Sequence, residues 1–85
     1  MQYEYGKKYL AIRKTWDNRF EVIDAFIKKC YHGETRKFSH AFDTKYKTEN
    51  GALKSLSRWK ENLKHYNYVI IENILDKSEF QGDKI

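Results

Sequence analysis

The chain has 85 residues, of which 40% are hydrophobic and 16% aromatic, and its 17 basic and 12 acidic side chains give a net charge of +5. This length predicts one domain, and the aromatic content excludes a disordered chain because these side chains alone can fill a small core. The single cysteine, the lack of an apolar run of membrane-spanning length and the absence of a signal-peptide pattern predict a cytoplasmic, reducing environment and no membrane partner.

The first predicted element is a β-strand at residues 8–15. In an extended chain Leu10 and Ile12 would point to one side, while Tyr9 and Ala11 would point to the other. The alternation is partial, and it favours a strand over a helix at this end of the chain.

Residues 18–32 fit two structures, and the sequence favours a helix. The apolar residues fill one half of a helical wheel, Asn18 with Glu21 resembles a capping box, and a glycine follows at the expected C-terminal cap. The alternative is a β-hairpin that turns at Asp17 and Asn18 and places Lys14 opposite Glu21. We prefer the helix because a strand here would carry apolar residues on both faces and because this turn lacks the favoured asparagine-glycine pair.

The hydrophobic period changes from two to about three and a half near Thr48. Before this point Phe38 and Phe42 share one face of a predicted strand, and after it Leu56 and Trp59 have helical spacing. We expect a helix over about 48–65 with Thr48 as its N-cap. The residues assigned to the core in this part of the chain are Phe38, Phe42, Tyr46, Leu56, Trp59 and Leu63.

Residues 66–75 form the most strand-like run of the chain. Its consecutive residues Val69, Ile70 and Ile71 are typical of a strand covered on both faces, so we expect it inside the sheet. Residues 76–85 show no hydrophobic periodicity, which predicts a flexible tail whose Phe80 can dock on the domain.

The predicted fold class is α+β: one compact domain over residues 1–75, with a three- or four-stranded sheet packed against the C-terminal helix at about 48–65. The preferred order adds a second helix at 18–32, and the alternative order is βββαβ with a hairpin there. The alternative is similar, in outline, to small DNA-binding modules in which a three-stranded sheet packs on one helix.

No motif predicts an enzyme, a metal site or a cofactor. Cys30 and His32 are close in sequence, but a structural zinc site needs four ligands and His40 and His65 lie far along the chain. The four glycines are too widely spaced for a phosphate-binding loop. We therefore expect a non-enzymatic protein with an inert, buried Cys30 and solvated histidines.

The basic residues give the strongest functional signal. Residues 1–71 hold 15 basic and 8 acidic side chains, a density that allows salt-sensitive contact with phosphates. Exposed tyrosine or histidine among them can stack on unpaired bases. The alternative interpretation is that these surface lysines only keep a small domain soluble. The residues predicted to bind nucleic acid or an acidic partner are Lys28, Lys29, Arg36, Lys37, Lys45, Lys47, Lys54 and Arg58.

Protein binding is the other predicted function. The small size, the lysine- and tyrosine-rich composition and the acidic tail on a basic body resemble small proteins of phages and other mobile elements, some of which inhibit host enzymes or defence complexes. The resemblance implies an anti-CRISPR-like inhibitor that acts by protein–protein contact on an acidic surface. An exposed strand edge can also pair with a partner or with a second copy of the chain, giving a homodimer.

Overall fold

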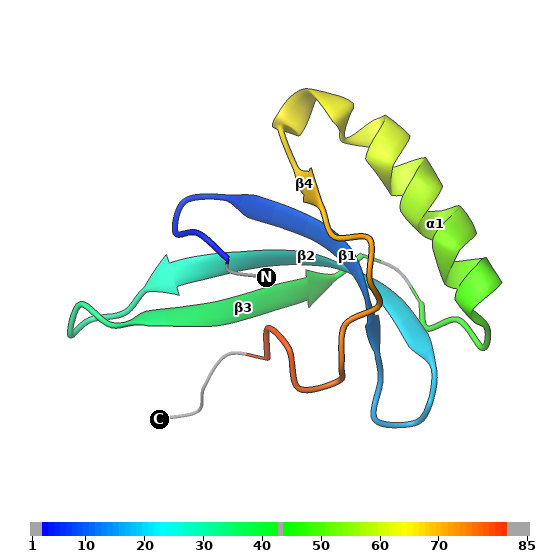
Figure 1. Ribbon diagram of the computed structural model, residues 1–85, viewed down its shortest axis with the longest axis horizontal. Helices are drawn as coiled ribbons and strands as arrows, with labels where there is room; N and C mark the ends of the chain where they lie inside the picture. The colour runs from blue at the N-terminus through cyan, green and yellow to red at the C-terminus, as the bar shows by residue number, and fades with distance from the viewer. Residues whose placement is uncertain (1–2, 43, 82–85) are drawn as a thin grey trace.

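The computed structural model describes residues 3–42 and 44–81, and these form a four-stranded sheet with one helix packed on it (Figure 1). The elements in chain order are β1 (Lys8–Lys14), β2 (Phe20–Lys29), β3 (Thr35–Ala41), α1 (Glu49–Asn62), a 3₁₀ turn (Lys64–Tyr66) and β4 (Val69–Ile70). The strand order is β3-β2-β1-β4; β1 pairs antiparallel with β2 and parallel with β4, and β2 pairs antiparallel with β3. The α+β class is confirmed, in the βββαβ order.

The preferred helix at residues 18–32 is wrong, because this segment contains β2. The turn before β2 is closed by Thr15, whose N–H donates to the Arg19 carbonyl at 2.8 Å, while Asn18 takes a left-handed φ of 60° that asparagine tolerates. The register differs by one residue from the hairpin considered above, since Arg13 rather than Lys14 lies opposite Glu21.

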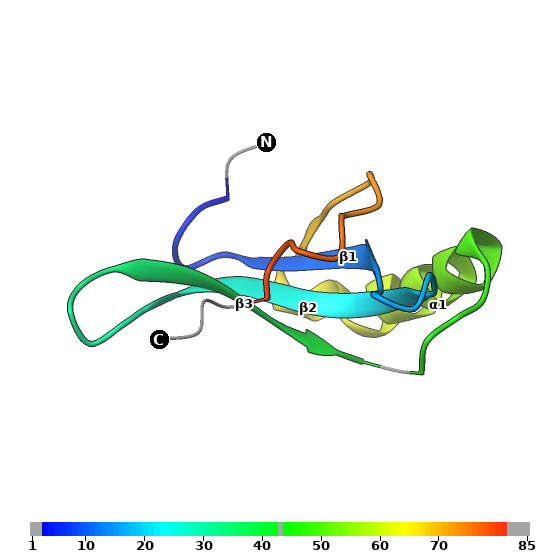
Figure 2. The same ribbon diagram turned by 90° about the horizontal axis from the view of Figure 1, so that it is seen from below.

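The sequence of β2 has apolar residues on both faces, which favoured a helix over a strand. They are explained by the packing of the sheet, because each of its faces is covered by another part of the chain. One face of the sheet packs on α1 through a cluster of buried residues formed by Leu10, Ile12, Val22, Ala52 and Leu56. The other face packs on the segment after β4 through Tyr9, Ala11, Ile23, Ala25, Ile71, Leu75 and Phe80. Figure 2 shows the N-terminal segment and the segment after β4 on the same side of the sheet. A strand that is covered on both sides needs apolar residues on both.

The helix α1 follows the sequence prediction. The Thr48 hydroxyl accepts a hydrogen bond from the Gly51 N–H at 3.1 Å and caps the first turn. Trp59 stacks on Phe42 with ring centroids 4.5 Å apart, and this pair packs against the cluster under the helix.

The strand predicted at residues 66–75 is shorter than expected and lies at an edge of the sheet rather than inside it. β4 comprises Val69 and Ile70, and Leu75 returns to β1 through an isolated bridge to Arg13. Before β4, Asn67 takes a left-handed φ of 56°, which interrupts the extended chain. The prediction that this segment is covered on both faces is confirmed, since Ile70 packs on the α1 side of the sheet and Ile71 on the other side.

The chain after Leu75 is attached to the sheet by Phe80, whose side chain is 1% exposed. Its ring contacts Tyr3 at a centroid distance of 4.6 Å and Tyr9 at 6.2 Å. The Ser39 hydroxyl donates to the Phe80 carbonyl at 2.8 Å. Phe80 therefore docks on the sheet, and residues 82–85 of the predicted flexible tail lie outside the described residues.

Candidate nucleic-acid interface

β2 and β3 extend beyond α1 as a ribbon (Figure 1). In an antiparallel pair, residues directly opposite each other project to the same face. Ile12 and Val22 are such a pair and pack toward α1, so every second residue of β2 from Val22 onward projects to the helix side. The side chains that share this face on the ribbon, which we call the aromatic–basic face, are Lys8, Phe26, Lys28, Arg36, Phe38 and His40.

Three aromatic rings stack at the centre of the aromatic–basic face. Phe26 and Phe38 lie directly opposite each other with ring centroids 6.0 Å apart and an interplanar angle of 22°. The His40 ring lies 5.8 Å from Phe26 at 29°. Both phenylalanines are half-buried, His40 is exposed, and none of the three belongs to either core cluster of the described residues. The stack therefore offers aromatic surface to solvent.

Cations surround this stack toward the tip of the ribbon. Lys28 lies opposite Arg36, and Lys8 of β1 lies opposite Phe26; both lysines are exposed. The Arg36 side chain is 16% exposed, and its Nη2 atom lies 3.5 Å from Glu34 Oε2. These groups give the outer part of the face a positive charge.

An acidic group marks the inner end of the face. Asp24 lies opposite His40 and is half-buried. Burial raises the pKa of the Tyr68 phenol, and the nearby Asp24 carboxylate raises this pKa further. An anionic ligand would therefore be favoured at the ribbon end, away from Asp24.

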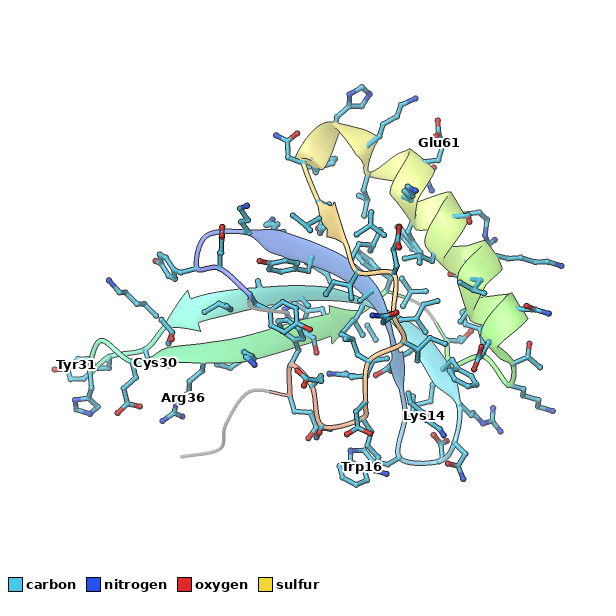
Figure 3. All side chains as sticks on the ribbon, in the orientation of Figure 1. Lys14, Trp16, Cys30, Tyr31, Arg36 and Glu61 are labelled. Carbon is cyan, nitrogen blue, oxygen red and sulfur yellow. The ribbon has the colours of Figure 1, made fainter. Side chains whose placement is uncertain are left out.

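The tip of the ribbon carries a further exposed aromatic side chain. Tyr31 is 98% exposed and meets His32 edge to face at a centroid distance of 5.2 Å. The turn is closed by Cys30, whose N–H donates to the Glu34 carbonyl at 2.7 Å, and Gly33 supplies the positive φ of 82° that the turn requires. Figure 3 shows Tyr31 at the far end of the ribbon, well away from α1.

The basic residues predicted along the ribbon are divided between its two faces. Lys28 and Arg36 come together on the aromatic–basic face. Lys29 and Lys37 project to the opposite face, where their ammonium groups lie over aromatic rings. The Nζ atom of Lys29 is 5.5 Å from the centroid of Tyr5, and that of Lys37 is 5.2 Å from the centroid of Tyr3.

The other predicted basic residues lie near α1. Lys45 Nζ is 3.5 Å from Asp17 Oδ1, beside the turn between β1 and β2. Lys47 is exposed just before the helix, and Lys54 and Arg58 are exposed on it, one turn apart. The predicted residues therefore form separate groups rather than one continuous surface.

Sequence reasoning missed the aromatic part of this face. Phe38 was assigned to the core, but its ring lies outside both core clusters of the described residues. Phe26 was assigned to the apolar half of a helix, but it lies on β2 and its ring is also outside these clusters. One signal was available: Phe26 and Phe38 are equidistant in sequence from His32, so a hairpin centred there places them opposite each other.

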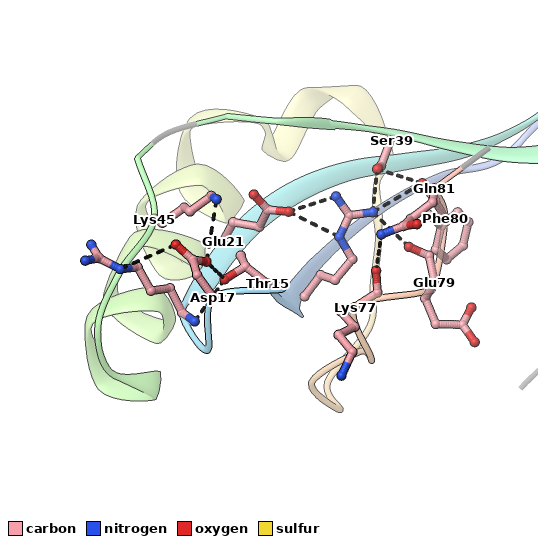
Figure 4. Close-up of polar contacts among 11 residues, drawn as sticks. Thr15, Asp17, Glu21, Ser39, Lys45, Lys77, Glu79, Phe80 and Gln81 are labelled. Carbon is pink, nitrogen blue, oxygen red and sulfur yellow. Dashed lines mark hydrogen bonds and ion pairs between the residues drawn. The ribbon is translucent and has the colours of Figure 1, made fainter. Parts of the chain in front are cut away.

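A second group of charged side chains lies around a cavity of about 400 Å³ near the turn between β1 and β2. Figure 4 shows that its polar groups are engaged with one another. The Thr15 hydroxyl donates to Asp17, and this hydrogen bond together with nearby Lys45 lowers the pKa of the Asp17 carboxyl. Trp16 is 68% exposed, and Lys77 Nζ lies 5.1 Å from its ring centroid.

Residues 3–42 and 44–81 contain neither a metal-binding cluster nor a membrane-spanning helix. No group of three or more His, Cys, Asp or Glu side chains is arranged to hold a metal ion. In the same residues, no helix combines the length and apolar character needed to cross a bilayer. Comparison of the chain with family models, curated proteins and solved structures gave no match.

Proposed function

We propose that the chain is a non-enzymatic protein that binds single-stranded nucleic acid on its aromatic–basic face. The observation that supports this most directly is the ring stack of Phe26, Phe38 and His40, which lies outside the core and is bordered by cations. A fold needs its large aromatic side chains for its core, so a stack left half-exposed on a sheet suggests a ligand.

The chemistry of the face fits an unpaired strand. Stacking of a base on an aromatic side chain contributes about 1–3 kcal/mol and tolerates any base sequence, because every base has a π-face. Lys8, Lys28 and Arg36 are within the same face and can contact the phosphates between stacked bases. A duplex hides the faces of its bases, so the rings give no advantage for double-stranded DNA or RNA.

The proposal can be tested with two charge-matched double variants. Lys28→Ala with Arg36→Ala removes one lysine and one arginine from the aromatic–basic face, and Lys54→Ala with Arg58→Ala removes the same charges from α1. Fluorescence anisotropy with a labelled single-stranded oligonucleotide should give about tenfold weaker binding for the ribbon variant, from lost phosphate contacts, and almost no change for the helix variant. The wild-type chain should bind the matching duplex more weakly than the single strand.

Three outcomes would contradict the proposal. Equal loss in both variants would mean that binding follows net charge alone. Loss confined to the helix variant would assign binding to α1. Absence of binding by the wild-type chain at low salt would remove the nucleic-acid function.

Exposed aromatic side chains elsewhere support a second candidate, an anti-CRISPR-like inhibitor that binds an acidic protein surface. Tyr31 and Trp16 are of the types enriched at the energetic centres of protein interfaces, and Lys77 lies over the Trp16 ring. A pull-down from the native host with and without nuclease separates the two candidates. A protein retained after nuclease treatment supports the inhibitor, and loss of all partners supports direct nucleic-acid binding.

A further inference from the structure

We propose that the edge strand β3 pairs antiparallel with β3 of a second copy of this chain, so that the two sheets join into one. β3 and β4 are the two edges of the sheet. β4 consists of Val69–Ile70, whereas β3 is a seven-residue strand without proline. An edge of this length exposes a row of backbone donors and acceptors to any strand that can match it.

The hydrogen bonds to β2 establish which groups of β3 face outward. The Phe42 N–H donates to Val22, and the Cys30 N–H donates to Glu34, at the two ends of the β2–β3 pair. Because bonding alternates along an antiparallel strand, the even-numbered residues of β3 are bonded to β2. The outward-facing backbone groups belong to Thr35, Lys37, Ser39 and Ala41. Among residues 3–42 and 44–81, no other segment forms a backbone hydrogen bond with these groups.

The length and charge pattern of β3 favour self-pairing centred on Phe38. Phe38 is the central residue of Thr35–Ala41, so an antiparallel pair centred on Phe38 uses the whole strand. In this register Lys37 lies opposite Ser39 of the second copy, and Arg36 lies opposite His40. A centre at Lys37 or at Arg36 would instead place two like charges directly opposite each other, which is unfavourable.

The same register joins the aromatic–basic faces of the two copies. The two-fold axis is perpendicular to the sheet, so both faces lie on the same side of the dimer. The Phe38 residues would form a pair without direct hydrogen bonds, in which the Cβ atoms are about 4.5–5.5 Å apart. The stack of Phe26 on Phe38 would then continue across the axis into the second copy. On the opposite side, the Lys37 Nζ atom lies 5.2 Å from the centroid of the Tyr3 ring of the same copy.

The proposed pairing needs the outward-facing backbone N–H groups of β3, and sedimentation equilibrium in the absence of nucleic acid tests this requirement. Lys37→Pro removes an outward N–H and leaves the pairing with β2 in place, and Lys37→Ala is the matched control that keeps the N–H. The wild-type chain and Lys37→Ala should approach twice the 10.3 kDa mass of the chain as concentration rises to the millimolar range. Lys37→Pro should remain monomeric with an unchanged far-ultraviolet circular dichroism spectrum.

A cross-linking experiment tests the register independently of the proline. In a Cys30→Ser background, Phe38→Cys places the only thiols of the two copies opposite each other on the axis, where a disulfide can form. Oxidation should give a covalent dimer in high yield, whereas Lys47→Cys in the same background should give little. A wild-type chain that stays monomeric at all concentrations, or equal cross-linking at both positions, would overturn the proposal. Since no nucleic acid is present, either result would leave the proposed function to its own test.

Discussion

Arg13 and Glu21 lie directly opposite each other on β1 and β2, and the arginine Nε and Nη2 atoms both donate to Glu21 Oε1, at 3.2 and 2.8 Å. Each side chain is 12% exposed. The Nη1 atom of Arg13 also donates to the Ser39 hydroxyl and to the carbonyl of Glu79, both at 2.8 Å (Figure 4). One guanidinium group thus connects three strands with the segment after β4.

Arg13→Ala should lower the free energy of unfolding by about 3 kcal/mol, because it leaves the Glu21 carboxylate in a nearly buried site without its counter-charge. Glu21→Gln, which keeps a hydrogen-bond acceptor for Arg13, should cost less. Urea denaturation of both variants gives the two values. If Arg13→Ala cost no more than an exposed substitution such as Lys47→Ala, the network would have no role in stability.

The position of Arg13 also shows what the sequence could and could not predict. The strand over residues 8–15 and the helix beginning after Thr48 were predicted because each has a local signal: alternation in one, a capping hydroxyl and helical spacing in the other. The hairpin register has no such signal. A difference of one residue decides whether Arg13 or Lys14 meets Glu21, and the turn geometry fixes it.

Residues 18–32 were assigned to a helix because the pattern of β2 depends on partners remote in sequence. Ile23 is buried by Leu75 and Phe80, and Val22 by α1. From the sequence alone, nothing shows that the C-terminal segment packs back on β2. Without that information, the apolar residues on both faces of β2 resemble the broad apolar face of a helix. The same limit applied to the site, because Lys28 and Lys29 could be separated onto opposite faces only after β2 was known to be a strand.

Phe80→Ala should mainly lower the stability of the fold, whereas Phe26→Ala should mainly weaken the binding of single-stranded nucleic acid. Phe80 is 1% exposed, so its truncation should cost about 3–5 kcal/mol of unfolding free energy. Phe26 lies outside both core clusters, and its truncation should cost much less while weakening single-strand binding by about 1–3 kcal/mol. Thermal unfolding and fluorescence anisotropy measure the two quantities. A large stability loss for Phe26→Ala would show that the ring supports the fold instead.

The salt dependence of binding should report the two ribbon cations. For single strands, log K falls with log salt concentration by about 0.7 for each phosphate neutralised. The variant that lacks Lys28 and Arg36 should therefore show a slope reduced by about 1.4 from that of the wild-type chain. The variant that lacks Lys54 and Arg58 should keep the wild-type slope. Titrations at four or more salt concentrations give the slopes, and a reduced slope in the helix variant would place phosphates on α1.

Stability should decrease at alkaline pH through Tyr68. Burial raises the pKa of this phenol above the value of 10.0 for a free tyrosine, and the Asp24 carboxylate adds to the shift. Below about pH 9 the phenol is neutral in both the folded and the unfolded chain, so its contribution to the free energy of unfolding is fully present there. As pH rises further, the unfolded chain loses this proton first and binds fewer protons than the folded chain, so the free energy of unfolding falls.

The alkaline decrease can be assigned to Tyr68 by substitution. Tyr68→Phe should reduce the slope of unfolding free energy against pH between about pH 9 and pH 11, because the group that titrates is removed. Tyr31→Phe is the control, since Tyr31 is 98% exposed at the tip of the ribbon and belongs to neither core cluster of the described residues. Urea denaturation at a series of pH values measures the slopes. Identical slopes for Tyr68→Phe and the wild-type chain would mean that other groups, with Tyr3 foremost because burial also raises its pKa, account for the alkaline loss.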